Sequence, residues 1–221
     1  MEKPNTLKTC VILPTKNEEE SISYMIDEIK KLNLPIIVID EHSTDKTIEI
    51  AKSKNVEVFQ REGSGKGAGV ISAVNIAHKK GYDIMVLIDC DATYPPKYIP
   101  QLLDIMAESD MVIGIRQMTS VRFLHRLPNL IHTQSINLLF NTNLHDINSG
   151  LRVIRVKKIH GLLNAQGFDI EAQITIKAIK QGFRIKEIPI KYDKRLGSSK
   201  IRIKDGYVIL ARIIKERFDR K

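Results

Sequence analysis

Aromatic residues and cysteine are scarce in this chain, and each scarcity excludes a class of protein. Phe, Tyr and Trp together make up 5% of the sequence, and Trp is absent. Single-stranded nucleic acids bind largely by stacking on aromatic side chains, so few platforms of that kind are available. The two cysteines, Cys10 and Cys90, lie in or beside apolar segments. This is the usage of free thiols in a reducing compartment and argues against a disulfide framework.

Long apolar runs are also missing. No run approaches the roughly 18 residues that a membrane-spanning helix needs, and residues 1–8 lack the apolar core of a signal peptide. We therefore expect a cytoplasmic protein that does not span a membrane.

Positive charge is the main compositional excess. Lys and Arg number 35 against 26 Asp and Glu, a net charge of +9, in a chain of ordinary globular composition. Such a surplus favours an anionic partner: a nucleic acid, a phosphorylated substrate or an acidic membrane. Helix-turn-helix, zinc and RNA-recognition signatures are absent from the sequence. A nucleic-acid-binding protein therefore stays an alternative that the charge alone supports.

Strand and helix patterns alternate through the first half, which predicts a mostly parallel sheet covered by helices on both faces. The expected strands are 10–13, 36–39, 56–59, 84–88, 111–113 and 184–188. A helix is expected to open at Asn17 and the acids after it. Later helices are expected over about 129–140, 168–180 and 205–218.

The strand 84–88 ends in two carboxylates, Asp89 and Asp91. Residues i and i+2 of an extended segment point the same way, so both can converge on one cation at the strand's carboxyl end. Mg²⁺ and Mn²⁺ are typically held by such carboxylates together with substrate phosphates. The alternative is a pair of solvated turn aspartates.

A glycine-rich loop spans residues 63–69. It is not a Walker loop, because Gln60 and Gly67 stand where that motif needs Gly and Ser or Thr. Two interpretations stay open: a turn that begins a helix, or a contact of the loop backbone and Lys66 with a nucleotide.

Taken together, the motifs resemble glycosyltransferase family 2. The blocks that carry the resemblance are 11–18, 38–45, 89–91, 146–152, 167–171 and 187–200. The last block, with Arg195, Gly197, Ser199 and Lys200, is similar to that of the dolichyl-phosphate sugar synthases. The resemblance implies an α/β GT-A fold, an αβα sandwich in a single domain. Residues of about 9–114 would form its nucleotide-sugar half and about 115–204 its acceptor half, followed by a basic amphipathic helix over 205–221.

The resemblance also implies roles for individual residues. Asp89 and Asp91 would hold Mg²⁺ or Mn²⁺ on the diphosphate of a nucleotide sugar, and transfer would invert the anomeric centre. Asp146 occupies the position of the general base. With a lipid phosphate acceptor we expect Asp146 only to position and tune charge, and a plain Asx-turn is the alternative. The donor-binding residues would be Pro14, Thr15, Asn17, Glu18, Asp40 and Lys66, and the acceptor-binding residues Arg116, Arg126, Arg195, Ser199 and Lys200.

Two departures from the family pattern bear on the donor. Glu41-His42 replaces the usual Asp-Gly, which removes a glycine turn. Thr93 stands where mannose-transferring relatives have Gln, which favours UDP-N-acetylglucosamine as donor, then UDP-glucose, then GDP-mannose. The expected acceptor is dolichyl or another polyprenyl phosphate; a glycan or protein hydroxyl is the alternative.

The basic segments and the final helix bear on whether the protein attaches to a membrane. Basic residues gather around 116–126 and 191–204, which predicts peripheral, salt-sensitive attachment to the cytoplasmic face of an anionic membrane. The final helix carries apolar residues at helical spacing, a stripe more typical of core packing than of a membrane face. Its members are Tyr207, Leu210, Ala211, Ile214 and Phe218.

Overall fold

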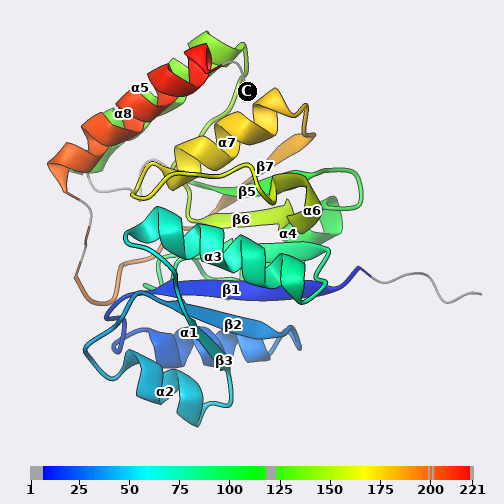
Figure 1. Ribbon diagram of the computed structural model, residues 1–221, viewed down its shortest axis with the longest axis vertical. Helices are drawn as coiled ribbons and strands as arrows, with labels where there is room; N and C mark the ends of the chain where they lie inside the picture. Colours follow the sequence, from blue (N-terminus) through cyan, green and yellow to red (C-terminus); the bar gives the residue numbers. More distant parts are fainter. Residues whose placement is uncertain (1–6, 118–122, 199, 201, 220–221) are drawn as a thin grey trace, which may run out of the picture.

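The computed structural model describes residues 7–117, 123–198, 200 and 202–219. Seven strands form one sheet between two layers of helices (Figure 1). Across the sheet the order is β3-β2-β1-β4-β6-β5-β7. The strands are β1 (Thr9–Thr15), β2 (Ile36–Asp40), β3 (Glu57–Gln60), β4 (Ile84–Ile88), β5 (Met111–Arg116), β6 (Leu151–Arg155) and β7 (Ile185–Ile190).

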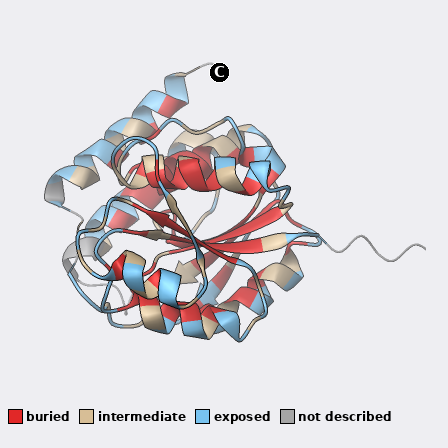
Figure 2. Cartoon of the chain, turned by 60° about the horizontal axis from the view of Figure 1, so that its bottom comes forward, coloured by how far each residue is buried: buried red, intermediate tan, exposed pale blue. Residues whose placement is uncertain are grey.

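Both faces of the central strands are buried, as the apolar runs predict. In β1 the side chains alternate between two cores: Val11 and Leu13 belong to one, Cys10 and Ile12 to the other. The first core lies under α1 (Ile22–Lys30), α2 (Thr47–Ser53) and α4 (Ile99–Ile105), and the second under α3 (Lys66–Lys79), α6 (Val156–Ile159) and α7 (Ile170–Lys180). The red band of buried residues in Figure 2 follows these layers. The predicted αβα sandwich with a mostly parallel sheet is confirmed.

A third, smaller core joins α7 to two further helices, α5 (Phe123–Phe140) and α8 (Ile203–Phe218). α5 and α8 lie side by side at one end of the molecule (Figure 1). α8 packs inward through Ile209 and Ile213, whereas Tyr207, Ala211, Ile214 and Phe218 are exposed. The core-packing interpretation of the final helix's stripe is therefore wrong for these four residues. Within the described residues no helix is long and apolar enough to cross a bilayer.

The sequence did not predict β6, which runs antiparallel between β4 and β5. Its second residue, Arg152, is fully buried. The guanidinium donates to Ser149 O at 3.0 Å, to Thr175 Oγ1 at 2.8 Å and to Ile147 O. A buried charge is tolerated only when it is hydrogen-bonded in this way. Arg152 thus ties β6 and the turn before it to α7.

We expect Arg152→Met to lower the free energy of unfolding by about 2–4 kcal/mol, since it leaves buried carbonyls without donors. Chemical denaturation measures the change. Arg217→Met, an exposed arginine on α8, should change stability by no more than about 0.5 kcal/mol. Equal effects in the two variants would contradict the role given to Arg152.

Candidate active site

A cavity of about 810 Å³ opens at the carboxyl ends of the parallel strands. This edge is where open α/β sheets bind their ligands. Residues from the ends of β1, β2 and β4, from α3, α5 and α7, and from the segment between β7 and α8 line it. Among them are Pro14, Thr15, Lys16, Glu18, Ile39, Glu41, Arg61, Lys66, Asp89, Asp91, Thr93, Tyr94, Arg116, Asn129, His132, Asn148, Phe168, Glu171, Tyr192, Arg195, Lys200 and Ile209.

Asp89 is paired with Lys66, the first residue of α3. The Lys66 ammonium lies 2.9 Å from Asp89 Oδ1 and 2.7 Å from Glu171 Oε1. Burial lowers the pKa of Lys66, but the two carboxylates outweigh it and raise that pKa above its ordinary value. Lys66 therefore stays charged at the floor of the cavity. The sequence did not single out Glu171, although the block 167–171 pointed to its neighbourhood.

Asp91 is held by Thr93 and Arg195. Thr93 donates to Asp91 Oδ1 from its backbone N at 3.0 Å and from Oγ1 at 2.5 Å. Arg195 Nη1 donates to Asp91 Oδ2 at 2.5 Å. Arg195 also pairs with Glu18 at 3.1 Å, and Glu18 accepts from Lys200. The segment after β7 thus crosses the cavity and places two cations among the carboxylates that follow β1 and β4.

Gly150 leaves room for Asp89. Asp89 N donates to Gly150 O at 3.2 Å, and Gly150 N donates to Tyr94 Oη at 2.8 Å. A Cβ on Gly150 would lie 2.0 Å from Asp89 Oδ2. Only glycine therefore permits this position of the carboxylate.

The glycines of the 63–69 loop serve close packing. A Cβ on Gly65 would lie 2.2 Å from Gln166 O, and one on Gly67 would lie 2.2 Å from Ala165 O. Gly67 N donates to Gln166 O at 2.9 Å. The loop thus lies directly against the segment before α7, which brings Lys66 to Glu171.

Some of the residues proposed to bind the nucleoside line the cavity and others do not. Pro14, Thr15 and Glu18 line the cavity. Asp40 is fully buried, and its carboxylate accepts from Ser43 N at 2.9 Å and Ser43 Oγ at 2.5 Å.

Asn17 accepts from Thr44 N through Oδ1 at 2.8 Å. It is exposed and has a φ of 50°. It precedes α1, which begins only at Ile22, later than the sequence indicates. Neither Asn17 nor Asp40 lines the cavity.

The acceptor side of the cavity carries Arg116. Its guanidinium contacts Asp146 at 2.7 and 2.8 Å, donates to Asn129 Oδ1 at 3.1 Å and lies 5.5 Å from the Tyr192 ring centroid. Asp146 is buried, and although burial raises its pKa, Arg116 outweighs that effect and lowers it.

Of the other residues proposed for the acceptor, Arg195 and Lys200 line the cavity and Arg126 does not. Ser199 lies outside the described residues.

The sequence matches the family model "Glycosyl transferase family 2" over residues 10–163. The chain belongs to this family. It is a glycosyltransferase, and its sheet order and layers are those of the GT-A fold. A structure of glucosyl-3-phosphoglycerate synthase from Mycobacterium tuberculosis, in complex with Mn²⁺, UDP and phosphoglyceric acid, superimposes with a TM-score of 0.81 at 20% identity. The match covers 96% of this chain and 79% of that one.

Two curated relatives carry more specific names. The dolichyl-phosphate hexose transferase of Haloferax volcanii is 29% identical over 86% of this chain and 85% of its own. The polyprenol monophosphomannose synthase of Mycolicibacterium smegmatis is 28% identical over 89% and 82%. These names support the resemblance to dolichyl-phosphate sugar synthases.

The relatives do not support N-acetylglucosamine as the sugar, since their names specify hexose and mannose. The structure explains why Thr93 is a poor guide. Its hydroxyl is 2.5 Å from Asp91 Oδ1, and the residue is 1% exposed. Thr93 therefore positions a carboxylate and leaves no free group to distinguish one sugar from another.

We expect Gly150→Ala to displace the Asp89 carboxylate and to slow transfer on the order of a hundredfold, with the melting temperature little changed. Steady-state transfer assays and thermal melts measure both. Gly167→Ala is the matched control, because its Cβ would make only an ordinary 3.4 Å contact. Normal activity of Gly150→Ala would show that the position of Asp89 is not critical.

Proposed function

We propose that the enzyme transfers a hexose, mannose in the first instance, from a nucleoside diphosphate sugar to a polyprenyl phosphate. The observation that carries the proposal is the pairing of charges in one cavity. Asp89 and Asp91 lie at its floor, and Lys66, Arg116, Arg195 and Lys200 surround them. Such an arrangement accepts a cation and two phosphate-bearing substrates together. The names of the relatives agree with both substrates.

The carboxylates fit Mg²⁺ or Mn²⁺. Both aspartates supply hard oxygen donors directly after a strand. In this structure Asp89 pairs with Lys66 and Asp91 with Arg195, so each carboxylate lies where it can bind a positive charge. The residues that the structure describes contain no group of three or more acidic, His or Cys side chains suited to a metal. The diphosphate and water would therefore complete the coordination. A metal bound here supplies Lewis-acid stabilisation of the departing diphosphate.

The acceptor brings its own nucleophile. A phosphate monoester has a second pKa of about 6, so its oxygen is an anion at neutral pH and needs no strong base. Asp146 is already held in two contacts by Arg116, and its pKa is lowered. Asp146 therefore orients Arg116, and Arg116 binds the acceptor phosphate. A hydroxyl acceptor would need a free base at this position, which disfavours that alternative.

Arg195 and Lys200 complete the acceptor site. In the ligand-free arrangement both pair with carboxylates of the donor side, Asp91 and Glu18. When Asp91 is engaged by the donor complex, Arg195 loses that partner and can turn to the acceptor phosphate. This exchange favours binding of the donor before the acceptor.

The transfer assay combines the purified protein, polyprenyl phosphate and a panel of GDP- and UDP-sugars, with Mn²⁺ or with chelator. We expect a lipid-linked hexose only when a divalent cation is present. Asp91→Ala should lower the rate on the order of a hundredfold or more, whereas Asp104→Ala, an exposed aspartate on α4, should not. Full activity of Asp91→Ala with chelator present would overturn the metal assignment.

A membrane-facing surface accompanies this function. We define the apolar face as the exposed residues Leu127, Leu130, Ile131 and Leu138 of α5 and Tyr207, Val208, Ile214 and Phe218 of α8. Leu138 is 85% exposed and Phe218 77%. Side chains of this size are seldom left in water in such number on two adjacent helices. α5 and α8 also supply Asn129 and Ile209 to the cavity lining, so the apolar face borders the acceptor side.

Charge makes an anionic bilayer the favoured partner of the apolar face. α8 carries Lys204, Lys215 and Arg217 as exposed cations, and each basic residue near an anionic surface contributes up to about 1 kcal/mol. An amphipathic helix with such a composition lies in the membrane interface. Peripheral attachment would present the lipid phosphate to the cavity.

Sedimentation with anionic phosphatidylglycerol vesicles tests the attachment. The Leu138→Ser/Phe218→Ser variant should lose most of its binding, and high salt should weaken binding of the unaltered protein. Tyr24→Ser, which removes an exposed aromatic residue on α1, is the control. Unchanged sedimentation of the double variant would show that the apolar face does not contact membranes.

A further inference from the structure

His132 of α5 lies in the wall of the cavity but has no role in the proposed mechanism. The residue is 5% exposed, and it lines the cavity together with residues of α8. Its two ring nitrogens face different parts of the chain. Nε2 lies 3.0 Å from Gly206 O near the start of α8, and Nδ1 lies 3.1 Å from Asn148 Nδ2 in the turn before β6. His132 therefore joins α5 to two segments that are distant in the sequence.

Arg116 fixes the direction of the hydrogen bonds that lead to His132. A guanidinium can only donate, so the Asn129 amide atom that faces Arg116 Nη2 at 3.1 Å is the oxygen. The same oxygen accepts one hydrogen of Asn148 Nδ2 at 2.8 Å. The second hydrogen of Nδ2 is donated to His132 Nδ1. Nδ1 therefore carries no proton, and the proton of the neutral ring lies on Nε2, which donates it to Gly206 O.

The neutral form of His132 is also the form that its surroundings favour. Burial lowers the pKa of His132, and the hydrogen bond to Gly206 O opposes that effect only in part. A proton on Nδ1 would point at the N–H of Asn148 and break the chain of hydrogen bonds. Asn148 Oδ1 is buried and has no hydrogen-bond partner among the described residues. The Asn148 side chain is thus held through Nδ2 alone, by Asn129 on one side and His132 on the other.

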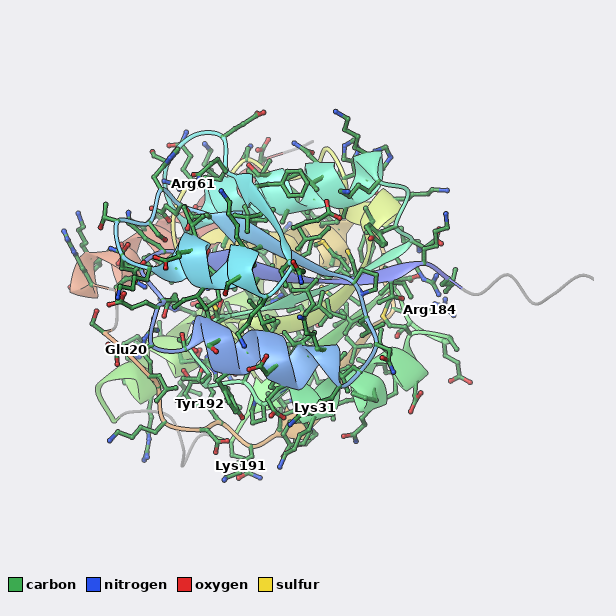
Figure 3. All side chains as sticks on the ribbon, turned by 90° about the horizontal axis from the view of Figure 1, so that it is seen from below. Glu20, Lys31, Arg61, Arg184, Lys191 and Tyr192 are labelled. Carbon is green, nitrogen blue, oxygen red and sulfur yellow. The ribbon has the colours of Figure 1, made fainter. Side chains whose placement is uncertain are left out.

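The Arg116 guanidinium at the other end of this chain has one nitrogen left for a ligand. Asp146 accepts from Nε at 2.7 Å and from Nη2 at 2.8 Å, and Nη1 makes no hydrogen bond to any described residue. Cζ lies 5.5 Å from the ring centroid of Tyr192, which Figure 3 shows at the end of the molecule away from Arg184. Asp146 alone would let the guanidinium swing about the carboxylate. The contact with Asn129 removes that freedom.

We infer that His132 is a positioning residue that holds Arg116 in place through two intervening amides and fastens it to the start of α8. The amides are those of Asn148 and Asn129. The inference rests on the proposed function in giving Arg116 the acceptor phosphate as its ligand. Arg116 is then ordered before the acceptor arrives, so that binding costs less conformational entropy. Because α8 also carries part of the apolar face, His132 connects that face to the arginine.

Two variants separate the two hydrogen bonds of His132. His132→Asn places an amide oxygen where Nδ1 accepts from Asn148, but its side chain is too short to reach Gly206 O. His132→Gln reaches Gly206 O with an amide nitrogen, but it offers Asn148 no acceptor at the position of Nδ1. Transfer to polyprenyl phosphate is measured with Mn²⁺ and the nucleotide sugar that the unaltered protein uses. We expect His132→Gln to raise the acceptor KM about tenfold and to leave the donor KM unchanged, because a hydrogen bond that orders Arg116 is lost. His132→Asn should keep the acceptor KM within about twofold of the unaltered value.

The order of the two variants distinguishes positioning from packing. If His132 served only as a contact between α5 and α8, His132→Gln would be normal and His132→Asn impaired, and that result would overturn the inference. Equal changes of the donor and acceptor KM in His132→Gln would also overturn it. Gln134→Ala removes an exposed side chain of α5 and should change neither KM.

Nitrogen-15 NMR tests the hydrogen-bond chain without any substrate. At neutral pH the His132 ring of the unaltered protein should carry its proton on Nε2 alone. The signals are assigned by their loss in His132→Gln. A proton on Nδ1 would overturn the inference, even if transfer to polyprenyl phosphate is observed. Absence of that transfer in the unaltered protein would reject the proposed function instead, and the tautomer would still show whether His132 holds Asn148.

Discussion

The ion pair between Asp91 and Arg195 is the contact on which the arrangement of the cavity depends. It joins residues 104 positions apart at 2.5 Å and brings the segment after β7 across the ends of β1 and β4. Like charges about 4 Å apart repel by roughly 4 kcal/mol at an effective dielectric constant of 20. The carboxylates of Glu18 and Asp91 therefore need cations between them. Backbone contacts hold the same crossing, with Asp193 N donating to Thr93 O at 2.9 Å and Leu196 N to Asp91 O at 3.0 Å.

A second set of charges connects the apolar face to the catalytic end. Arg212 of α8 pairs with Asp169 at 2.7 Å, directly before α7. Further along α8, Glu216 accepts from Gln173 at 2.7 Å and pairs with Lys177 at 3.0 Å. α7 also carries Glu171, the partner of Lys66. These contacts make α8, α7 and the floor of the cavity one packed unit. The apolar face is thereby held at a fixed position relative to the cavity.

The first half of the fold was predictable because its signals are local. Runs of β-branched residues mark the parallel strands, and acids follow where those strands end. The strand β6 was not predicted because Arg152 interrupts its apolar pattern. One of the three partners that allow a buried arginine there, Thr175, lies far along the chain. The prediction of the sugar from Thr93 was not supported, for a related reason. The Thr93 hydroxyl pairs with a carboxylate two residues away, and sequence spacing alone does not distinguish this contact from a contact with substrate. Glu171 and Arg61 were missed because their partners come from other elements. Local hydrophobic periodicity thus predicts the strands and helices, whereas the site is defined by ion pairs between different elements, which the sequence does not reveal.

The proposed choice of acceptor follows from the contacts of one buried carboxylate, Asp146. Asp146 could serve as a base only if it were free to take a proton. Arg116 holds it through two short contacts, Asn148 N donates to it at 3.2 Å, and its pKa is lowered as a result. An ionised carboxylate locked in this way stabilises a neighbouring cation and resists protonation. The cation in turn faces the cavity. Under the proposed function the nucleophile therefore arrives already charged, a condition that a phosphate monoester satisfies and an alcohol does not.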